Sequence, residues 1–437
     1  MQFNYLIISS NDNCGFRCTR LHLCGIMTRK IIVLATLSLA ITFCPAQSRT
    51  RKVVFIIADG IPADLIEKDS VPALREIQNI GGYSRAYVGG EKGGYSQTPT
   101  ISANGYNSLL TSSWVNKHNV WGNDIKAPNY NYWTVFRFLK NDQPGKKIGI
   151  YSTWKDNRTK LVGESLEQTG NIKFDYAFDG YELDTLQYPH DKQSNYTHLI
   201  DERVASEAAK SIHDNAPDLS WVYLEYSDDM GHRYGNSPQM EQAINYVDQQ
   251  VGKIWEAIEY RMKNFNEDWL IIVTTDHGRD DKTGRNHGGQ SERERTTWIF
   301  TNAKKLNGEF QGHAAIVDIT PTIARFLQIN IPDDRLKEMD GVPFIGDISV
   351  SSPMAAVEGD SIHVSWTAMD HAGEAKVYYT TTNNFKEGGT DQYILAGHCK
   401  VSQEGLSFSI KNNPADFFKI LIVAPHNQVN RWISTKK

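Results

Sequence analysis

The chain has 437 residues, of which 40% are hydrophobic and 22% are charged, and its formal net charge is −5. A chain of this length and composition can bury large cores in two or three domains, which excludes a disordered, collagen-like or coiled-coil protein. The negative charge argues against a general nucleic-acid-binding surface, and the single long apolar run near the N-terminus excludes a multi-span membrane protein.

The first 46 residues end in the layout of a secretory signal peptide. A basic stretch at Met27–Lys30 precedes 13 uncharged, mostly apolar residues at Ile31–Phe43, and small residues follow. Such a run is too short to span a bilayer but matches the apolar core of a signal peptide. We therefore expect residues 1–46 to be removed, with Met27 as an alternative start. The mature chain would be secreted or periplasmic without a transmembrane span, and lipid attachment at Cys44 is the alternative.

Residues 47–346 alternate apolar strands with amphipathic helices. Residues between Met240 and Ile258 recur at spacings of three and four, which predicts a helix with one apolar face. Continuous apolar runs are typical of strands buried on both faces, and they occur at Val53–Ile57, Ile148–Tyr151, Trp221–Tyr226 and Trp269–Thr274. This alternation predicts an α/β catalytic domain with a mostly parallel sheet and helices on both faces.

Residues 347–437 have a different pattern. Segments such as Ser361–Trp366 and Leu406–Ile410 alternate polar and apolar residues, and turn-forming residues separate them. Short alternating strands without a long helix predict a small C-terminal β-sandwich of the immunoglobulin or fibronectin type.

Acidic and histidine side chains follow three of the predicted strands at the point where each strand ends, and a further histidine, His287, follows in a polar loop. Functional groups gather beyond the carboxyl ends of parallel strands, so we expect these side chains to meet at one edge of the sheet. Each alone could be a helix cap, a turn or a surface residue, but their joint occurrence favours a metal site. Carboxylates and imidazoles suit two divalent cations, most readily Zn²⁺ with Mn²⁺ as the alternative, that clamp a phosphoryl transfer. The six side chains are Asp59, Asp228, His232, Asp276, His277 and His287.

A hydroxyl-rich segment supplies a candidate nucleophile. Residues 98–112 begin with hydroxyl side chains and continue into a predicted helix. A hydroxyl at a helix N-terminus lies near unpaired backbone N–H groups and the positive end of the dipole, which favour an alkoxide and a bound phosphate. The alternative is that Ser102 only caps the helix.

These motifs occur in an order that resembles the alkaline phosphatase superfamily, in its type I phosphodiesterase/nucleotide pyrophosphatase branch. The resemblance covers about residues 52–345 and implies an alkaline-phosphatase-like fold with two metal sites. The motifs are Ala58-Asp59-Gly60, the hydroxyl-led helix, His118–Asn123, Asp228-x₃-His232, Asp276-His277-Gly278 and His287-Gly288. The implied ligand sets are Asp59, Asp276 and His277 with Ser102 for one metal, and Asp228, His232 and His287 for the other.

The resemblance also implies the roles of two further groups. It locates the nucleophile nine residues before Thr111, which is Ser102, and it implies a covalent phosphoserine intermediate. Because Ser112 replaces the glycine usual after Thr111, Thr100 stays an alternative nucleophile. Asn123 matches the amide that steadies a non-bridging phosphate oxygen.

The residues around the predicted nucleophile favour phosphodiesters or nucleotide pyrophosphates as substrates. We find no arginine beside it, and Asn123 is a neutral donor, which suits a singly charged diester. Lys155 and Arg158 follow the strand at Ile148–Tyr151 and could bind the second charge of a monoester, although they could also be a solvated loop. Phosphomonoesterase activity at the same site is therefore the alternative, and a catalytically inactive surface-binding protein is a third hypothesis. In each enzymatic case the expected partner is a small phosphate ester or nucleotide.

Overall fold

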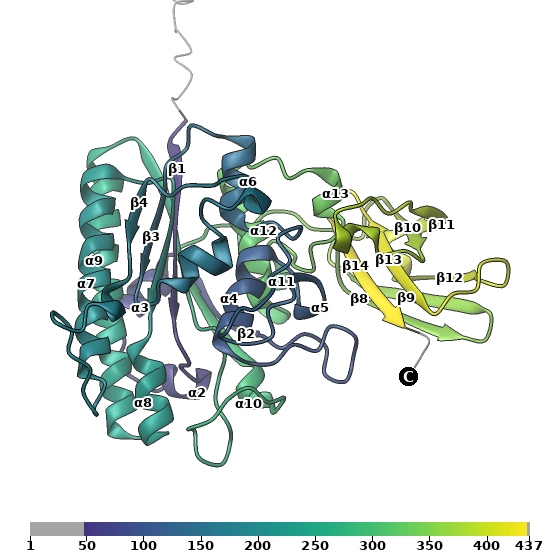
Figure 1. Cartoon of the computed structure of the whole chain (residues 1–437). Coiled ribbons are helices and arrows are strands. Elements are labelled where there is room, and N and C mark those ends of the chain that lie inside the picture. The colour runs from purple at the N-terminus through teal and green to yellow at the C-terminus, as the bar shows by residue number, and fades with distance from the viewer. Residues whose placement is uncertain (1–47, 435–437) are drawn as a thin grey trace, which may run out of the picture. The chain divides into compact units, whose positions relative to one another are not determined.

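The computed structural model describes residues 48–434, and the chain from Arg49 onward forms one compact unit (Figure 1). The predicted signal peptide and Cys44 lie outside the described residues. Within the described residues, no helix combines the length and the apolar character needed to cross a membrane. The predicted division into domains at residue 346 stays a prediction.

A central sheet of seven strands has the order β2-β7-β6-β1-β5-β3-β4. Strand β1 runs parallel to β5 and β6, and β3 runs parallel to β4 and β5, whereas β7 is antiparallel to both β2 and β6. The predicted mostly parallel sheet is therefore confirmed. The strands are β1 Thr50–Ala58, β2 Gly82–Tyr87, β3 Ile148–Ser152, β4 Tyr176–Phe178, β5 Leu219–Leu224, β6 Glu267–Thr274 and β7 Thr296–Thr301.

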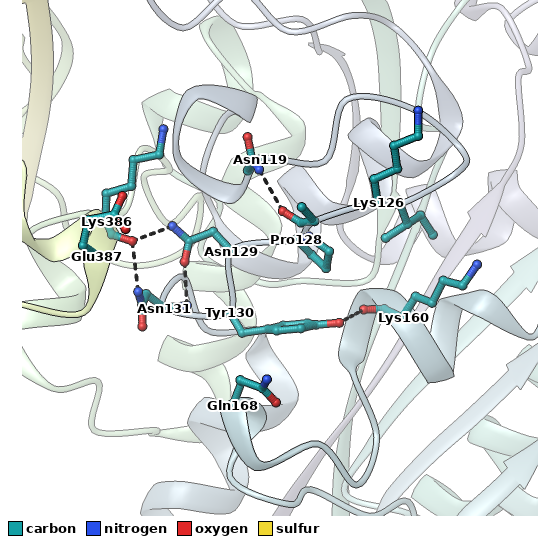
Figure 2. A pocket seen from close by; sticks show the side chains of 12 residues that line it. Asn119, Lys126, Pro128, Asn129, Tyr130, Asn131, Lys160, Gln168, Lys386 and Glu387 are labelled. Atoms are coloured by element: carbon teal, nitrogen blue, oxygen red, sulfur yellow. Dashed lines mark hydrogen bonds between the residues drawn. The ribbon is translucent and has the colours of Figure 1, made fainter.

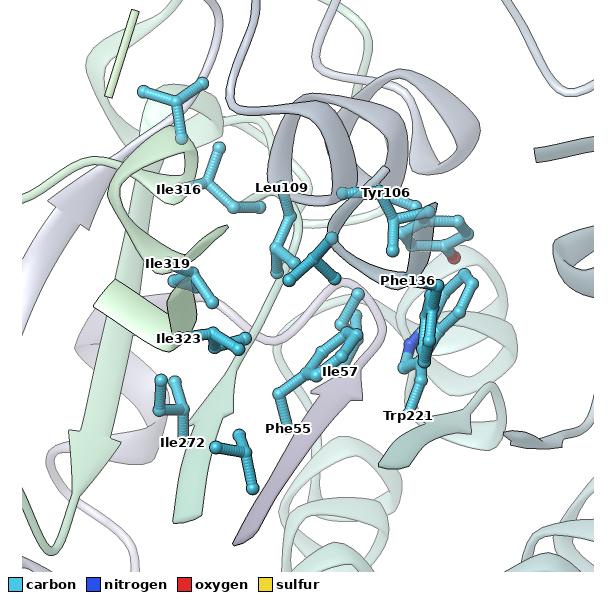
Figure 3. Close-up of a cluster of buried hydrophobic side chains, with 14 of the residues drawn as sticks. Phe55, Ile57, Tyr106, Leu109, Phe136, Trp221, Ile272, Ile316, Ile319 and Ile323 are labelled. Atoms are coloured by element: carbon cyan, nitrogen blue, oxygen red, sulfur yellow. The ribbon is translucent and has the colours of Figure 1, made fainter. Parts of the chain in front are cut away.

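Helices cover both faces of this sheet, because alternate side chains of β1 enter two different apolar clusters. Val53, Phe55 and Ile57 pack with α4, α6 and α12 in one cluster, part of which Figure 3 shows, and Val54 and Ile56 pack with α3, α7 and α9 in the other. A strand alternates its side chains between faces, so a continuous apolar run serves both cores. The helices are α2 Ala63–Ile66, α3 Pro72–Ile80, α4 Ser102–Thr111, α5 Val115–His118, α6 Val135–Asp142, α7 Asn195–Asn215, α8 Tyr226–Tyr234, α9 Pro238–Asn264, α10 Glu292–Arg295, α11 Gly308–Gly312, α12 Ile319–Leu327 and α13 Asp333–Leu336.

Strand β5 is shorter than the sequence analysis predicted. It ends at Leu224 and helix α8 begins at Tyr226, so the predicted strand end at Tyr226 is wrong. The carboxylate of Asp201 accepts hydrogen bonds from the backbone N–H groups of Glu225 and Tyr226. These bonds replace strand pairing and turn the chain into the helix.

Two antiparallel sheets follow residue 349, with the orders β11-β10-β13-β14 and β12-β9-β8. Val364 and Trp366 of one sheet share an apolar cluster with Val377, Ile420 and Ile422 of the other. The C-terminal β-sandwich is thus confirmed, while its immunoglobulin or fibronectin type stays a prediction. The strands are β8 Val350–Glu358, β9 Ser361–Ala368, β10 Glu374–Thr380, β11 Ile394–Lys400, β12 Gly405–Ser409, β13 Phe417–Val423 and β14 Gln428–Ser434.

Candidate metal and phosphate site

The ends of β1 and β6 bring three predicted ligands together. Ile57 pairs with Thr274, so Asp59 and Asp276 leave neighbouring strands at the same edge. His277 Nε2 lies 3.4 Å from Asp59 Oδ1 and 3.4 Å from Asp276 Oδ2, and all three side chains are buried. The three ligand atoms are close enough to one another to hold a metal ion.

The carboxylates of Asp59 and Asp276 each have one oxygen that accepts hydrogen bonds and one that has no hydrogen-bond partner. Asp59 Oδ2 accepts hydrogen bonds from the hydroxyls of Tyr223, at 2.7 Å, and Tyr106. Asp276 Oδ1 accepts a bond from the backbone N–H of Gly60 at 3.1 Å. Among the described residues, Asp59 Oδ1 and Asp276 Oδ2 are buried without a hydrogen-bond partner. Buried carboxylate oxygens need compensation, and a cation between them would supply it.

The pKa values of these three side chains shift in the directions that burial and the neighbouring charges predict. Burial, followed by the charge of Asp228, raises the pKa of Asp59 to about 7. Burial and then the neighbouring Asp59 raise the pKa of Asp276 well above its usual value. Burial and His287 lower the pKa of His277. With Nδ1 2.9 Å from the carbonyl oxygen of Gly278, the neutral imidazole donates there and keeps its Nε2 lone pair toward the carboxylates.

The second predicted ligand set lies on α8 and a polar loop. Asp228 and His232 are one helical turn apart, with Asp228 Oδ2 and His232 Nε2 separated by 3.2 Å. His287 Nε2 lies 3.0 Å from His232 Nε2 and 4.0 Å from Asp228 Oδ1. The rings of His277 and His287 stack with centroids 3.7 Å apart, so the two sets adjoin. The structure therefore brings all six side chains together, and Asp228, His277 and His287 also form a group that could hold a metal ion.

Ser102 is the first residue of α4 and lies beside the first ligand set. Its Oγ is 3.4 Å from His277 Nε2, and its side chain is 5% exposed. Ile101 occupies the capping position, so the alternative that Ser102 only caps the helix is wrong. The Thr100 hydroxyl instead donates to Gly289 O and accepts from Gly288 N, both at 2.9 Å. Thr100 thus ties the start of α4 to the loop of His287.

The three predicted phosphate-binding side chains differ in how they are engaged. Asn123 Oδ1 accepts a bond from Ala103 N in the first turn of α4, and among the described residues its Nδ2 has no partner. Arg158 donates to both carboxylate oxygens of Asp179, at 2.6 and 2.8 Å, and also pairs with Glu164. The ammonium of Lys155 has no ion pair within the described part of the chain. Arg158 is therefore committed to protein carboxylates, while Asn123 and Lys155 keep donors for a ligand.

Sequence analysis missed Arg279, which joins the two ligand sets. Its buried guanidinium donates to the carbonyl oxygens of Gly60 and Asp228, both at 2.9 Å, and to the carboxylate of Asp228. A Cβ on Gly60 or Gly231 would lie 2.6 or 2.1 Å from the guanidinium, so glycine is needed at both positions. Although burial opposes ionisation of Asp228, Arg279 overcomes it and lowers the pKa of that carboxyl. The arginine directly after Asp276-His277-Gly278 was the available signal.

These features describe an α/β protein whose sheet edge carries two adjoining Asp/His clusters and a helix-terminal serine. Residues 53–321 match the model of the type I phosphodiesterase / nucleotide pyrophosphatase family. Since the match covers more than half of the chain, the protein belongs to that family, and the resemblance inferred from its motifs is confirmed.

Individual relatives are distant. GPI ethanolamine phosphate transferase 3 of Schizosaccharomyces pombe is 26% identical over 193 residues, which are 42% of this chain and 20% of that protein. The 2,3-bisphosphoglycerate-independent phosphoglycerate mutase of Metamycoplasma hominis is 27% identical over 174 residues, which are 39% and 32% of the two chains. The chain thus spans about a fifth to a third of the length of these curated relatives.

Similar solved structures include human ectonucleotide pyrophosphatase / phosphodiesterase 5. It is 15% identical, with a TM-score of 0.46 over 64% of this chain and 96% of that one. A 2-O GAG sulfatase is 10% identical, with a TM-score of 0.49 over 84% and 86% of the two chains.

Proposed function

We propose that this protein is a secreted, zinc-dependent hydrolase of phosphate esters, a phosphodiesterase or nucleotide pyrophosphatase that forms a covalent phosphoserine at Ser102. The observation that supports this most strongly is the pair of unpartnered carboxylate oxygens on Asp59 and Asp276, both 3.4 Å from His277 Nε2. The Ser102 hydroxyl lies the same distance from that nitrogen.

Two sets of residues would hold the cations. Asp59, Asp276 and His277 offer two carboxylates and one imidazole, and Ser102 Oγ adjoins them. The other set offers one carboxylate and two imidazoles, from Asp228, His232 and His287. Oxygen and nitrogen donors in these numbers suit Zn²⁺. Bound there, such cations would favour the ionised serine and offset the charge of the phosphate oxygens.

The chain's own residues would then carry out a two-step displacement. The Ser102 hydroxyl gives its proton to solvent and Oγ attacks phosphorus. The bond from phosphorus to the leaving oxygen breaks as the bond to Oγ forms, and the leaving oxygen takes up a proton from solvent. Asn123 Nδ2 donates to a non-bridging oxygen, and the N-terminal end of α4 places its positive dipole beside the phosphate. Water next attacks the phosphoserine, which releases a phosphate monoester and returns the proton to Ser102 Oγ.

The state of Arg158 favours diesters over monoesters. A monoester dianion carries a second charge that calls for a further cation, and Arg158 already pairs with Asp179 and Glu164. Of the two predicted phosphate-binding cations, Lys155 and Arg158, Lys155 is the one without an ion pair among the described residues. Phosphomonoesterase activity at the same site is therefore the second candidate, and its support is Lys155.

The test is an assay of the purified protein with bis-p-nitrophenyl phosphate and p-nitrophenyl phosphate. We expect chelation to abolish hydrolysis, Zn²⁺ to restore it, and kcat/KM to be at least about tenfold higher for the diester. Lys155→Ala should change diester hydrolysis no more than the control Lys173→Ala. A monoester preference that collapses in Lys155→Ala would establish the phosphomonoesterase instead, and a metal-loaded protein without hydrolysis would support the inactive binding protein.

Secretion rests on the predicted signal peptide alone. N-terminal sequencing of protein recovered outside the cytoplasm should give a chain that begins near Gln47. A chain that retains residues 27–46 and stays in the cytoplasm would contradict this part of the proposal.

A further inference from the structure

Two hollows adjoin along the loop that follows α5. The smaller, of about 450 Å³, is lined by residues that include Trp121 and Asn123. The larger, of about 750 Å³, lies between the same loop, Lys160 and Lys386 (Figure 2). Both are lined by Asn119, Lys126 and Ala127, so we treat them as one groove and call it the loop groove.

The loop groove begins beside the proposed site of attack. Asn123 lines its smaller part, and Asn123 Oδ1 accepts a hydrogen bond from Ala103 N, the residue next to Ser102. An ester whose phosphate lies at Ser102 can therefore extend past Asn123 into the groove.

Three lysines line the larger part of the loop groove, and Figure 2 shows Lys386 on one side of it and Lys126 and Lys160 on the other. Lys126 pairs with Asp124 at 2.9 Å, with side chains 84% and 56% exposed, and Lys160 pairs with Asp156 at 2.7 Å, with side chains 46% and 28% exposed. Ion pairs this exposed are weak, so an anionic ligand can replace the carboxylate partners. Lys386 has no ion pair within residues 48–434, and the acids that line the groove are Glu387 in its larger part and Asp124 in its smaller part, against three lysines. The groove therefore favours a negative group.

The walls of the loop groove are held in place without a ligand. Trp121 is 56% exposed, yet its Nε1 donates to Asn119 Oδ1 at 3.0 Å, which fixes the ring. Asn129 and Asn131 both donate to the carbonyl oxygen of Lys386, at 2.8 and 3.0 Å, and anchor that residue against the loop. An exposed aromatic ring held by a hydrogen bond offers a flat surface at low cost in conformational entropy, and the anchored backbone of Lys386 keeps that residue at the wall of the groove.

We propose that the loop groove binds the portion of an ester substrate that lies beyond the scissile phosphate, and that it recognises a second anionic group there, a phosphate or a sulfate. A sugar or similar ring of that portion would lie against Trp121, and Lys386 would bind the anion with help from Lys126 and Lys160. The inference rests on the proposed function, because it takes Ser102 as the point of attack.

A matched series of p-nitrophenyl diesters tests the proposal. The alcohol arm is a sugar that carries a free hydroxyl, a phosphate or a sulfate at one position, and KM is measured separately from kcat. We expect the charged arms to lower KM about threefold to tenfold relative to the neutral arm, and 0.5 M salt to remove the difference. Lys386→Ala should abolish most of this preference. The control is Lys210→Ala, which removes an exposed lysine of α7 that does not line the groove.

Binding of the arm alone separates this inference from the proposed function. The sugar phosphate and the sugar sulfate, without the scissile phosphate, are titrated by calorimetry into the wild type, Lys386→Ala and Lys210→Ala. Binding that weakens in Lys386→Ala alone supports the loop groove even if the protein hydrolyses no ester, and the tighter arm identifies the anion. Equal binding by all three proteins, or no measurable binding, overturns the inference even if the diesterase assay succeeds.

Discussion

Two clusters of buried charge in this protein are built in opposite ways. The first, which we call the acid cluster, comprises Asp59, Asp228 and Asp276 with the histidines around them, and Arg279 is the cation it contacts. The second, which we call the lysine cluster, consists of Lys117, Lys419, Glu338, Asp340 and Asp391. In the lysine cluster two lysines meet three carboxylates and one oxygen, Glu338 Oε2, has no hydrogen-bond partner among the described residues, whereas the acid cluster has one arginine for three carboxylates and two such oxygens, on Asp59 and Asp276.

In the lysine cluster, Lys117 uses all its donors and Lys419 bridges two carboxylates. Lys117 Nζ lies 2.5 Å from Asp340 Oδ1 and 2.8 Å from both Glu338 O and Asn430 Oδ1, so its three hydrogens all have acceptors. Lys419 Nζ lies 2.8 Å from Glu338 Oε1 and from Asp391 Oδ2. Because Lys117 belongs to α5 and Lys419 to β13, these bonds join the α/β part to the C-terminal sheets.

The difference distinguishes a structural cluster from a binding site. Burying an unpaired charge is costly, and a fold keeps one only where something compensates it. In the lysine cluster the compensation is built into the chain. In the acid cluster, the excess of carboxylates over Arg279 leaves a place for cations from outside. The predictions below test this contrast.

The largest expected effect is the loss of the proposed nucleophile. Ser102→Ala should lower kcat for a diester at least about a thousandfold, because the alkoxide that attacks phosphorus is gone. Metal content should stay nearly unchanged, since three other ligand atoms remain in that set. The measurement pairs steady-state kinetics with metal analysis of the same preparation. An active Ser102→Ala together with an inactive Thr100→Ala would move the nucleophile to Thr100.

The lysine cluster should affect stability without affecting metal binding. Lys419→Met leaves Glu338 and Asp391 buried without their cation, which should lower the free energy of unfolding by about 3–5 kcal/mol. Urea denaturation measures this loss, and chelator competition should give an unchanged metal affinity. Lys376→Met on β10, where the side chain is exposed, is the control. A loss no larger than that of the control would show that the lysine cluster is not the structural element described above.

Arg279 should affect the acid cluster selectively. Arg279→Lys keeps the charge but loses the fork that contacts Gly60 O, Asp228 O and the Asp228 carboxylate together. Groups that orient metal ligands typically contribute about 10–100-fold in metal affinity or activity, and we expect a loss of that size. Metal dissociation constants from chelator competition are the readout, with Arg285→Lys as the exposed control. Unchanged metal affinity would mean that Asp228 is positioned without Arg279.

The sequence was sufficient to predict a mostly parallel sheet and the gathering of the six predicted ligands at one edge. Parallel strands end at one edge, so Asp59 after β1 and Asp276 after β6 were expected at the same edge, and the adjacency of the two strands comes from the fold. The continuous apolar run of β1 also indicated helices on both faces. These features follow from local periodicity and from the chain order of strands and motifs.

Other features depend on contacts between distant segments. Arg279 fits because Gly60 and Gly231 leave room for its guanidinium, and neither glycine reveals this in the linear sequence. Arg158 was a candidate for phosphate binding, but Asp179, 21 residues later, takes its donors. Tyr226 continued an apolar run in the sequence. The strand nevertheless ends before it, because Asp201, which lies 24 residues before Glu225, accepts a hydrogen bond from the backbone of Glu225. Where a side chain has several possible hydrogen-bond partners, the tertiary fold decides which of them it contacts.

His118 gives the smallest expected effect. It is a buried titratable group that follows Lys117 of the lysine cluster and contacts α4, and the fold keeps it without charge. Its Nδ1 accepts a bond from Val120 N at 3.1 Å, so Nε2 carries the proton and donates to Ser108 Oγ at 3.1 Å. Burial lowers the pKa of His118 to about 3, which means that the folded protein keeps the imidazole neutral. Protonation of Nδ1 would break the bond from Val120.

The sign of the resulting pH dependence follows from this lowered pKa. Below pH 6.5 the unfolded chain binds a proton at His118 and the folded chain does not, so stability falls as the pH drops from about 6.5 toward about 3. The slope from this one group is about 1.4 kcal/mol per pH unit, or about 2 kcal/mol between pH 6.5 and 5. We expect the difference in unfolding free energy between the wild type and His118→Gln to shrink by that amount over this range. Urea denaturation of both proteins after chelation excludes effects of metal release, and two parallel pH profiles would show that His118 is not held neutral by the fold.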